Sequence, residues 1–204
     1  MGTKGQQTRD HILKTAEDII LQRGYSGTSI EDIIGTAGIT KGGFFYHFDG
    51  KNDLARKLML RYLEQDELFF RKLIDRARTL TEDPLQQLLV FLKLLAEAMV
   101  DLPGTHPGCL VASFTYESQQ FDDEVRELNA RGVLSWRRIF TEQLEKIAAK
   151  YPMKIDRPLA ELADMLTSVI EGSIVVSKVL DDKDILPNQL LQYRNYIRLV
   201  FGDA

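Results

Sequence analysis

Two short helical segments joined by an Ala-Gly turn, within residues 28–48, constrain the fold of this 204-residue chain most strongly. The stretch Thr28-Ser29-Ile30-Glu31 matches a capping box in which Thr28 is the predicted N-cap, and isoleucines follow at helical spacing. Gly38 can adopt the positive φ that a tight turn requires. Thr40 is a natural N-cap for the next helix. Two helices joined by a short glycine-containing turn have the geometry of a DNA-binding helix-turn-helix.

The second of these helices, residues 40–48, has a composition that does not favour a helix on its own. It contains two glycines, each costing about 1 kcal/mol relative to alanine in a helix interior, and four aromatic residues. Phe44 and Phe48 are four residues apart, so we expect both to pack inward. Lys41 and Phe45 share a different face, which we expect to meet the major groove with Tyr46 alongside. The alternative is an aromatic core turn whose glycines are loop residues.

A third helix is predicted before these two. Thr8 is its predicted cap, Gly24 its predicted end, and an apolar stripe runs from Ile12 to Ile20. The three helices together form a compact head at the start of the chain.

This head resembles the tetracycline-repressor (TetR) family of one-component transcriptional regulators. The resemblance is carried by residues 28–33, by residues 37–42, and by Tyr46-His47-Phe48 followed by Lys51 and Asp53-Leu54. It implies an all-α fold of about nine helices. The implied domains are a helix-turn-helix DNA-binding domain at residues 1–51 and a larger helical ligand-binding and dimerisation domain at residues 52–204.

The resemblance also implies which residues contact double-stranded operator DNA. Physically, Lys41 can donate to guanine O6 or N7, and Phe45 can pack on a thymine methyl group. The sequence departs from the commonest family pattern at Gly43, Phe45 and Asp49, which bears on operator sequence and affinity. The predicted DNA-binding residues are Thr28, Thr40, Lys41, Gly42, Gly43, Phe45, Tyr46, His47 and Lys51.

The rest of the chain is predicted to be helical, in segments 52–78, 84–102, 107–120, 122–150, 158–179 and from Pro187 onward. The last two helices are the predicted homodimer surface, where two helices from each subunit would build a four-helix bundle. The alternative is that both helices close the core of their own subunit. The predicted interface residues are Leu162, Met165, Val169, Gly172, Ser173, Tyr193 and Ile197.

The resemblance implies a small-molecule cavity among the middle helices. Its mixture of aromatic residues with a few hydroxyl groups suits a largely apolar effector, although each residue could equally be plain core. Cys109, near a predicted helix N-terminus, is either a thiol sensor of electrophiles or oxidants or a small buried hydrophobe. The predicted lining residues are Phe91, Leu95, Met99, Cys109, Ser113, Tyr116, Trp136 and Phe140.

Composition and motifs exclude several other classes of protein. The single cysteine excludes an intrachain disulfide, and the chain has neither an apolar run of 18 residues nor an apolar leader, so we expect a cytoplasmic protein without membrane association. The three histidines lack metal-ligand spacing and no nucleophile motif occurs, so we expect no enzyme, metal or cofactor. A helical interaction module that does not bind DNA is the remaining alternative.

The net charge of −4 is unusual for a DNA-binding protein. Residues 1–60 contain 8 Lys+Arg and 7 Asp+Glu, a balance of +1, and the remaining residues contain 18 and 23, a balance of −5. The acidity therefore lies mainly outside the head. We expect weak binding to random DNA, and a preference for repression over activation follows only from the family resemblance.

Overall fold

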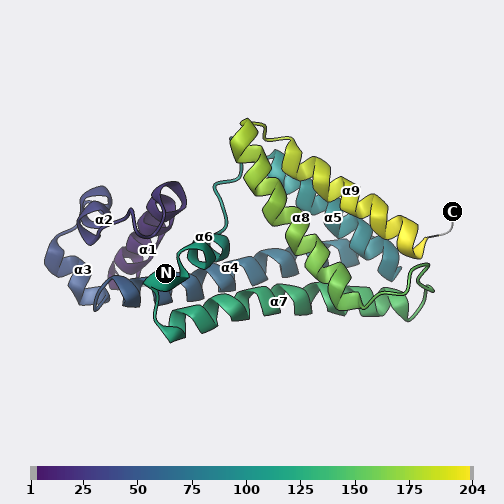
Figure 1. Cartoon of the computed structure of the whole chain (residues 1–204), viewed down its shortest axis with the longest axis horizontal. Coiled ribbons are helices and arrows are strands. Elements are labelled where there is room, and N and C mark those ends of the chain that lie inside the picture. Colours follow the sequence, from purple (N-terminus) through teal and green to yellow (C-terminus); the bar gives the residue numbers. More distant parts are fainter. Residues whose placement is uncertain (1–3, 203–204) are drawn as a thin grey trace. The chain divides into compact units, whose positions relative to one another are not determined.

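The computed structural model describes residues 4–202, and all regular secondary structure within this range is helical (Figure 1). The all-α prediction is therefore confirmed for this part of the chain. The helices are α1 (Lys4–Arg23), α2 (Ile30–Ala37), α3 (Lys41–His47), α4 (Lys51–Leu80), α5 (Pro84–Val100), α6 (Leu110–Tyr116), α7 (Asp123–Ala148), α8 (Leu159–Leu180) and α9 (Ile185–Phe201), with a 3-10 turn, η1, at Ser118–Gln120.

The chain divides into two compact units. The first contains the residues up to Gln65 together with Pro107–Val133, and the second contains Asp66–His106 together with the residues from Leu134 onward. The long helices α4 and α7 each contribute to both units. The helix-turn-helix head therefore shares a unit with α6, η1 and the first part of α7.

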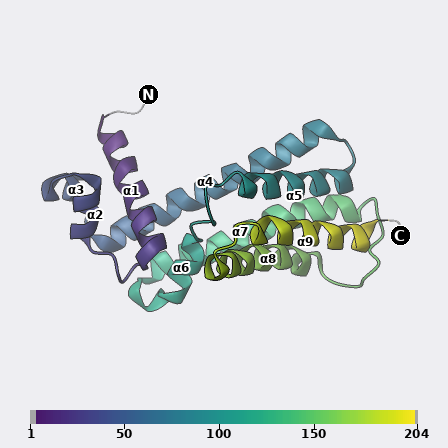
Figure 2. The same cartoon turned by 90° about the horizontal axis from the view of Figure 1, so that it is seen from above.

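The core of the first unit is built by the inner faces of α1 to α4, of which α1, α2 and α3 lie together in Figure 2. Phe44 and Phe48 are completely buried, with ring centroids 5.4 Å apart, which confirms that these two side chains pack inward. The helix-forming weakness of α3 is thus offset by burying two aromatic side chains, each of which contributes several kcal/mol, roughly 3–5, in a well-packed core.

Two of the predicted helix caps are wrong. The N-cap of α2 is Ser29, whose hydroxyl accepts from the Asp32 amide at 3.0 Å, while the Asp32 carboxylate accepts from the Ser29 amide at 2.9 Å. Thr28 is buried and donates its hydroxyl to the Gly24 carbonyl at 2.8 Å. Thr8 lies inside α1 and donates to the Lys4 carbonyl. Each threonine hydroxyl therefore donates to a carbonyl four residues earlier and does not cap a helix N-terminus.

Of the other predicted helix boundaries, the start of α3 is confirmed, and those of segment 107–120 and α9 differ from the prediction. Thr40 caps α3 by accepting from the Gly43 amide at 3.1 Å, as predicted. Segment 107–120 is not one helix but α6 followed by η1, and Cys109 is the N-cap residue of α6, outside its first turn. Helix α9 begins at Ile185, before Pro187, because proline is tolerated in a first turn where its missing N–H has no helical acceptor.

The second unit is a helical layer in which α9 packs on both α5 and α8 (Figure 1). An aromatic cluster fills part of its core: Phe70 lies 5.3 Å from Phe140 and 6.4 Å from Phe91, between ring centroids. The buried Tyr193 donates its hydroxyl to the Leu162 carbonyl at 2.8 Å, which joins α9 to α8.

Asp83 and Pro84 begin α5 as predicted, and Asp83 also fixes the chain segment after α7. Its carboxylate accepts from the Gln86 amide at 3.0 Å, from Lys150 Nζ at 2.6 Å and from the Tyr151 hydroxyl at 2.6 Å. Burial raises the pKa of Asp83, but these hydrogen bonds outweigh it and lower the pKa to about 2.

We expect Asp83→Ala to lower the free energy of unfolding by about 1 kcal/mol, the usual cost of a lost N-cap. Because the pKa is depressed from 3.8 to about 2, this contribution is complete above pH 3.8 and is lost as the pH falls toward 2. Urea unfolding at several pH values measures the difference. Asp83→Asn, which keeps a cap acceptor, is the control and should lose less. An effect of Asp83→Ala that does not shrink in acid would contradict this assignment.

Candidate nucleic-acid interface

Helix α3 presents a polar and aromatic face to solvent, and its other face is buried in the core of the first unit. Tyr46 is 82% exposed and Phe45 is 44% exposed, whereas the preceding residue, Phe44, is fully buried. The Lys41 side chain is 72% exposed and lies at the first helical position. Short side chains at this helix start leave room for a close approach to base edges. This face of α3 is therefore open to a partner outside the chain.

The two glycines of α3 have different roles. A Cβ atom at Gly43 would lie 3.3 Å from the Thr40 hydroxyl that caps the helix, so a larger residue would press on the cap. A Cβ atom at Gly42 would meet nothing within 4 Å, and Gly42 is exposed. A residue larger than glycine at position 43 would disturb the N-cap of α3. The absence of a side chain at Gly42 leaves open space on the exposed face of the helix.

The α2–α3 turn sets the direction in which Lys41 points. Gly38 has φ 66°, in the left-handed region that favours glycine, and its amide donates to the last turn of α2. The Lys41 ammonium lies 3.9 Å from Glu31, and both side chains are largely exposed. Such an exposed pair contributes only about 0–1 kcal/mol, so Lys41 can exchange this partner for a base or phosphate.

Besides Thr40, which caps α3, and Lys41, which pairs with Glu31, three further predicted DNA-contact residues are bonded within the chain. The Thr28 hydroxyl is bonded to Gly24, as described above. The half-buried Lys51 donates its ammonium to the Tyr25 carbonyl at 2.5 Å and lies 4.0 Å from the centroid of that ring. Burial lowers the pKa of the Lys51 ammonium. His47 is half-buried, and its carbonyl accepts from Lys57 at 3.1 Å.

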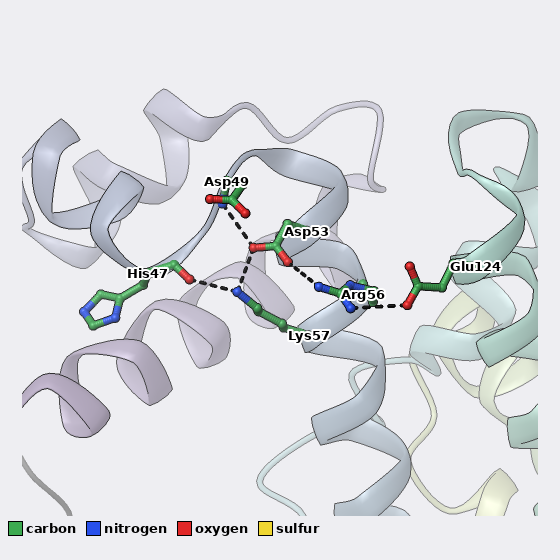
Figure 3. A network of polar contacts seen from close by, with 6 residues as sticks. All are labelled: His47, Asp49, Asp53, Arg56, Lys57 and Glu124. Carbon is green, nitrogen blue, oxygen red and sulfur yellow. Dashed lines mark hydrogen bonds and ion pairs between the residues drawn. The ribbon is translucent and has the colours of Figure 1, made fainter.

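A carboxylate-centred network, shown in Figure 3, holds the end of α3 to the start of α4. Asp53 accepts from the Asp49 amide at 3.1 Å, from Lys57 at 2.8 Å and from Arg56 at 2.9 Å. Arg56 also reaches Glu124, in the first turn of α7, at 3.2 Å. Burial raises the pKa of Asp53, but the hydrogen bonds prevail and lower it to about 2.

Sequence reasoning missed this network, although part of it has a local signal. Asp53, Arg56 and Lys57 follow the i, i+3 and i+4 spacing of ion pairs on a helix. The bond from Lys57 to the His47 carbonyl has no such signal, because it depends on how the α3–α4 connection turns.

The predicted effector-pocket residues fall into both units. Phe91, Leu95, Trp136 and Phe140 are buried in the second unit, and Met99 is partly exposed there. Cys109 is buried in the first unit, where Ser113 is half-buried and Tyr116 is 78% exposed. A small cavity of about 260 Å³ in the second unit is lined by none of the predicted residues; its lining is Leu85, Gln86, Leu89, Tyr151, Arg198 and Gly202.

The predicted dimer-interface residues divide between the inside and the outside of the second unit. Met165 is 38% exposed and Gly172 is also exposed, whereas Val169 is half-buried. The remaining four are buried within their own unit: Leu162, Ser173, Tyr193 and Ile197. The exposed apolar side chains of α8 and α9 are Met165, Val175, Val176, Val179, Leu180 and Leu199.

No group of three or more His, Cys, Asp or Glu residues among residues 4–202 is arranged to hold a metal ion. In the same range, no helix has the length and apolarity needed to cross a bilayer.

Comparison with known proteins gives matches along most of the chain. The family model "Bacterial regulatory proteins, tetR family" matches residues 12–58, and the model "Tetracyclin repressor-like, C-terminal domain" matches residues 84–189. The HTH-type transcriptional repressor DhaR of Mycobacterium sp. (strain GP1) is 26% identical over 180 residues, covering 87% of this chain and 86% of the relative. The HTH-type transcriptional repressor NemR of Escherichia coli (strain K12) is 22% identical over 193 residues, covering 93% and 94%.

Solved structures share the fold. A TetR-family transcriptional regulator from Agrobacterium tumefaciens superposes with a TM-score of 0.79 at 23% identity, covering 97% of this chain and 100% of that one. The reduced form of Escherichia coli NemR superposes with a TM-score of 0.77 at 20% identity, covering 97% and 99%. Since the C-terminal family model alone spans more than half of the sequence, the chain belongs to the TetR family of bacterial regulatory proteins.

Proposed function

We propose that this DNA-binding regulator is a ligand-responsive repressor that binds a palindromic operator as a homodimer. The observation that carries the proposal is the exposed face of α3, where Lys41, Phe45 and Tyr46 project from a helix whose other face is buried. In this proposal residues 1–51 read DNA, and residues 52–204 pair the subunits and bind the effector.

The residues of α3 divide the work of recognition. Lys41 donates to guanine, Phe45 packs on a thymine methyl group and Tyr46 binds a phosphate. With a net charge of −4, the protein gains little from general attraction to DNA. Specificity therefore rests on a few local contacts, and affinity for random duplex is weak.

The homodimer forms through the outward faces of α8 and α9. Met165, Gly172, Val176 and Val179 recur at helical spacing, and three of these four are apolar side chains left exposed by the subunit. Two such helices from each subunit form a four-helix bundle. The dimer then sets the separation of the two recognition helices, which must reach major grooves about 34–36 Å apart or a multiple of this distance.

The effector is a largely apolar small molecule held by aromatic side chains of the second unit, among them Phe91, Trp136 and Phe140. It releases DNA by population shift, because it binds better to a conformation in which the recognition helices are too far apart for the operator. Burial of the Cys109 thiol favours this mechanism over thiol-based sensing, since a reactive cysteine needs access to its oxidant.

The test is selection of duplexes from a randomised pool by the wild-type protein, followed by titration of the selected duplex and a scrambled one. We expect a twofold-symmetric consensus and a specificity ratio on the order of 10³ or more. Failure to enrich any sequence would overturn the proposal. This selected duplex is the DNA used in the experiments below.

A further inference from the structure

The turn between α1 and α2 is bonded to a residue far away in the sequence. The Glu117 carboxylate accepts from two successive backbone amides, with Oε1 2.7 Å from Tyr25 N and Oε2 2.7 Å from Ser26 N. All of these residues belong to the first unit. Glu117 lies between α6 and η1, and its own backbone is fixed because its carbonyl accepts from Gln120. Two short charge-assisted bonds from one carboxylate define a specific clamp.

The turn is shaped to receive this carboxylate. Gly24 has φ 78°, and a Cβ atom built there would lie 2.7 Å from Glu117 Oε1. Any other residue at position 24 would be strained and would also collide with the clamp. The carboxylate therefore occupies space that glycine leaves open.

Tyr25 has further contacts within the first unit. Its carbonyl accepts from Lys51, and its hydroxyl donates to Asn52 at 3.1 Å. Its ring packs on Phe121, with centroids 4.4 Å apart, and on Phe114, with centroids 5.7 Å apart. These three rings are buried, so apolar contact provides the attachment and Glu117 determines the position of the backbone. Burial raises the pKa of Glu117, but the Ser26 and Tyr25 bonds and the Lys51 charge lower it overall.

The clamped turn leads directly into the DNA-reading helices. Thr28 donates to Gly24 and its amide donates to Tyr25, so the turn is internally rigid up to the N-cap of α2 at Ser29. A displacement of residues 25 and 26 is therefore passed to α2, on which α3 packs. The segment that carries Glu117 can act on the recognition helix without touching DNA.

We propose that Glu117 is a positioning residue for DNA recognition, which holds the α1–α2 turn in the orientation that α3 requires. This inference rests on the proposed function, because it assumes that α3 reads DNA. It adds a physical link, through two backbone amides, between the α6–η1 segment and the head.

The first test compares Glu117→Gln with Glu127→Gln. The amide side chain keeps one acceptor oxygen but leaves one of the two backbone N–H groups without a partner. Glu127 is exposed on α7 in the same unit, so its replacement removes the same charge away from the turn. We expect Glu117→Gln to bind the selected duplex about tenfold more weakly, as when only a tenth of molecules keep the competent turn. Glu127→Gln should bind like the wild type.

The second test needs no variant and also serves if Glu117→Gln does not fold. Coupling between two equilibria is reciprocal, so a clamp that favours DNA binding must be strengthened by DNA. Amide hydrogen exchange is measured by NMR for Tyr25 and Ser26 in the wild-type protein, with the selected duplex and with a scrambled one. We expect the selected duplex to slow exchange at both amides by about tenfold or more, because the loss of affinity in the variant is a lower bound on the coupling between clamp and DNA.

Either of two results would overturn the inference. One is equal duplex affinity for the Glu117 and Glu127 variants. Another is exchange at Tyr25 and Ser26 that is the same with selected and scrambled duplex. Both leave the proposed function intact, because neither result changes whether the wild-type protein selects a twofold-symmetric duplex.

Discussion

Replacing Lys41 and Tyr46 together by alanine is expected to weaken binding to the selected duplex by about 100-fold or more. Lys41 supplies a base contact worth about 1–3 kcal/mol, and Tyr46 supplies a phosphate contact. Because both side chains are largely exposed, their loss should leave the fold and its unfolding temperature almost unchanged. Fluorescence anisotropy with the selected duplex measures the loss, and circular dichroism checks the fold.

A control is the double substitution Leu68→Ala and Lys72→Ala. It removes a lysine and a large apolar side chain at exposed positions of α4, outside α3. This control should bind DNA like the wild type. A Lys41/Tyr46 variant that binds within about threefold of the wild type would show that α3 is not the reading helix, since a single good base contact already exceeds that factor.

Placing lysine at both Val176 and Val179 is expected to produce a monomer and to abolish tight operator binding. These side chains are 44% and 77% exposed in the subunit and lie on the outward face of α8. Four lysines buried in a dimer interface would be desolvated without partners, which is strongly unfavourable. A monomer engages one half-site only, so we expect affinity for the full duplex to fall by about 10²–10⁴-fold.

Sedimentation equilibrium reports the oligomeric state of this variant, and anisotropy reports its DNA binding. The control is Val100→Lys, which changes another exposed valine of the second unit at the end of α5. It should remain dimeric. A Val176/Val179 variant that stays dimeric, or a monomer with undiminished affinity, would contradict the proposed assembly.

Short-range features of the fold could be predicted because one local interaction determines each of them. The spacing of Phe44 and Phe48 is enough to place both on the inner face of α3. Asp83-Pro84 begins α5 because aspartate caps the helix and proline fits its first position. The exposure of Lys41 and Tyr46 follows from the same periodicity.

The N-cap of α2 could not be predicted, because the sequence offers two overlapping capping boxes. Thr28 with Glu31 and Ser29 with Asp32 have the same spacing. The choice depends on the carbonyl of Gly24, which takes the Thr28 hydroxyl and leaves Ser29 to cap the helix. The local sequence pattern does not determine where that carbonyl lies.

Two further features could not be predicted from the sequence: the long-range contacts, and which of two apolar faces of a helix is buried. The clamp of Glu117 on Tyr25 joins residues 92 positions apart, and no spacing rule applies at that distance. In α8, apolar residues cover more than one face, so periodicity could not separate the buried Leu162 from the exposed Val179. Contacts with α9, such as that of Tyr193, determine which face is inside.

Methylation interference on the selected duplex tests the central claim most directly, because guanine N7 lies in the major groove and adenine N3 in the minor groove. The account predicts two symmetric clusters of interfering guanines, separated by about 34–36 Å along the duplex or a multiple of this distance, that disappear for the Lys41/Tyr46 variant. A single cluster, or interference confined to adenine N3, would contradict the insertion of two paired α3 helices into the major groove.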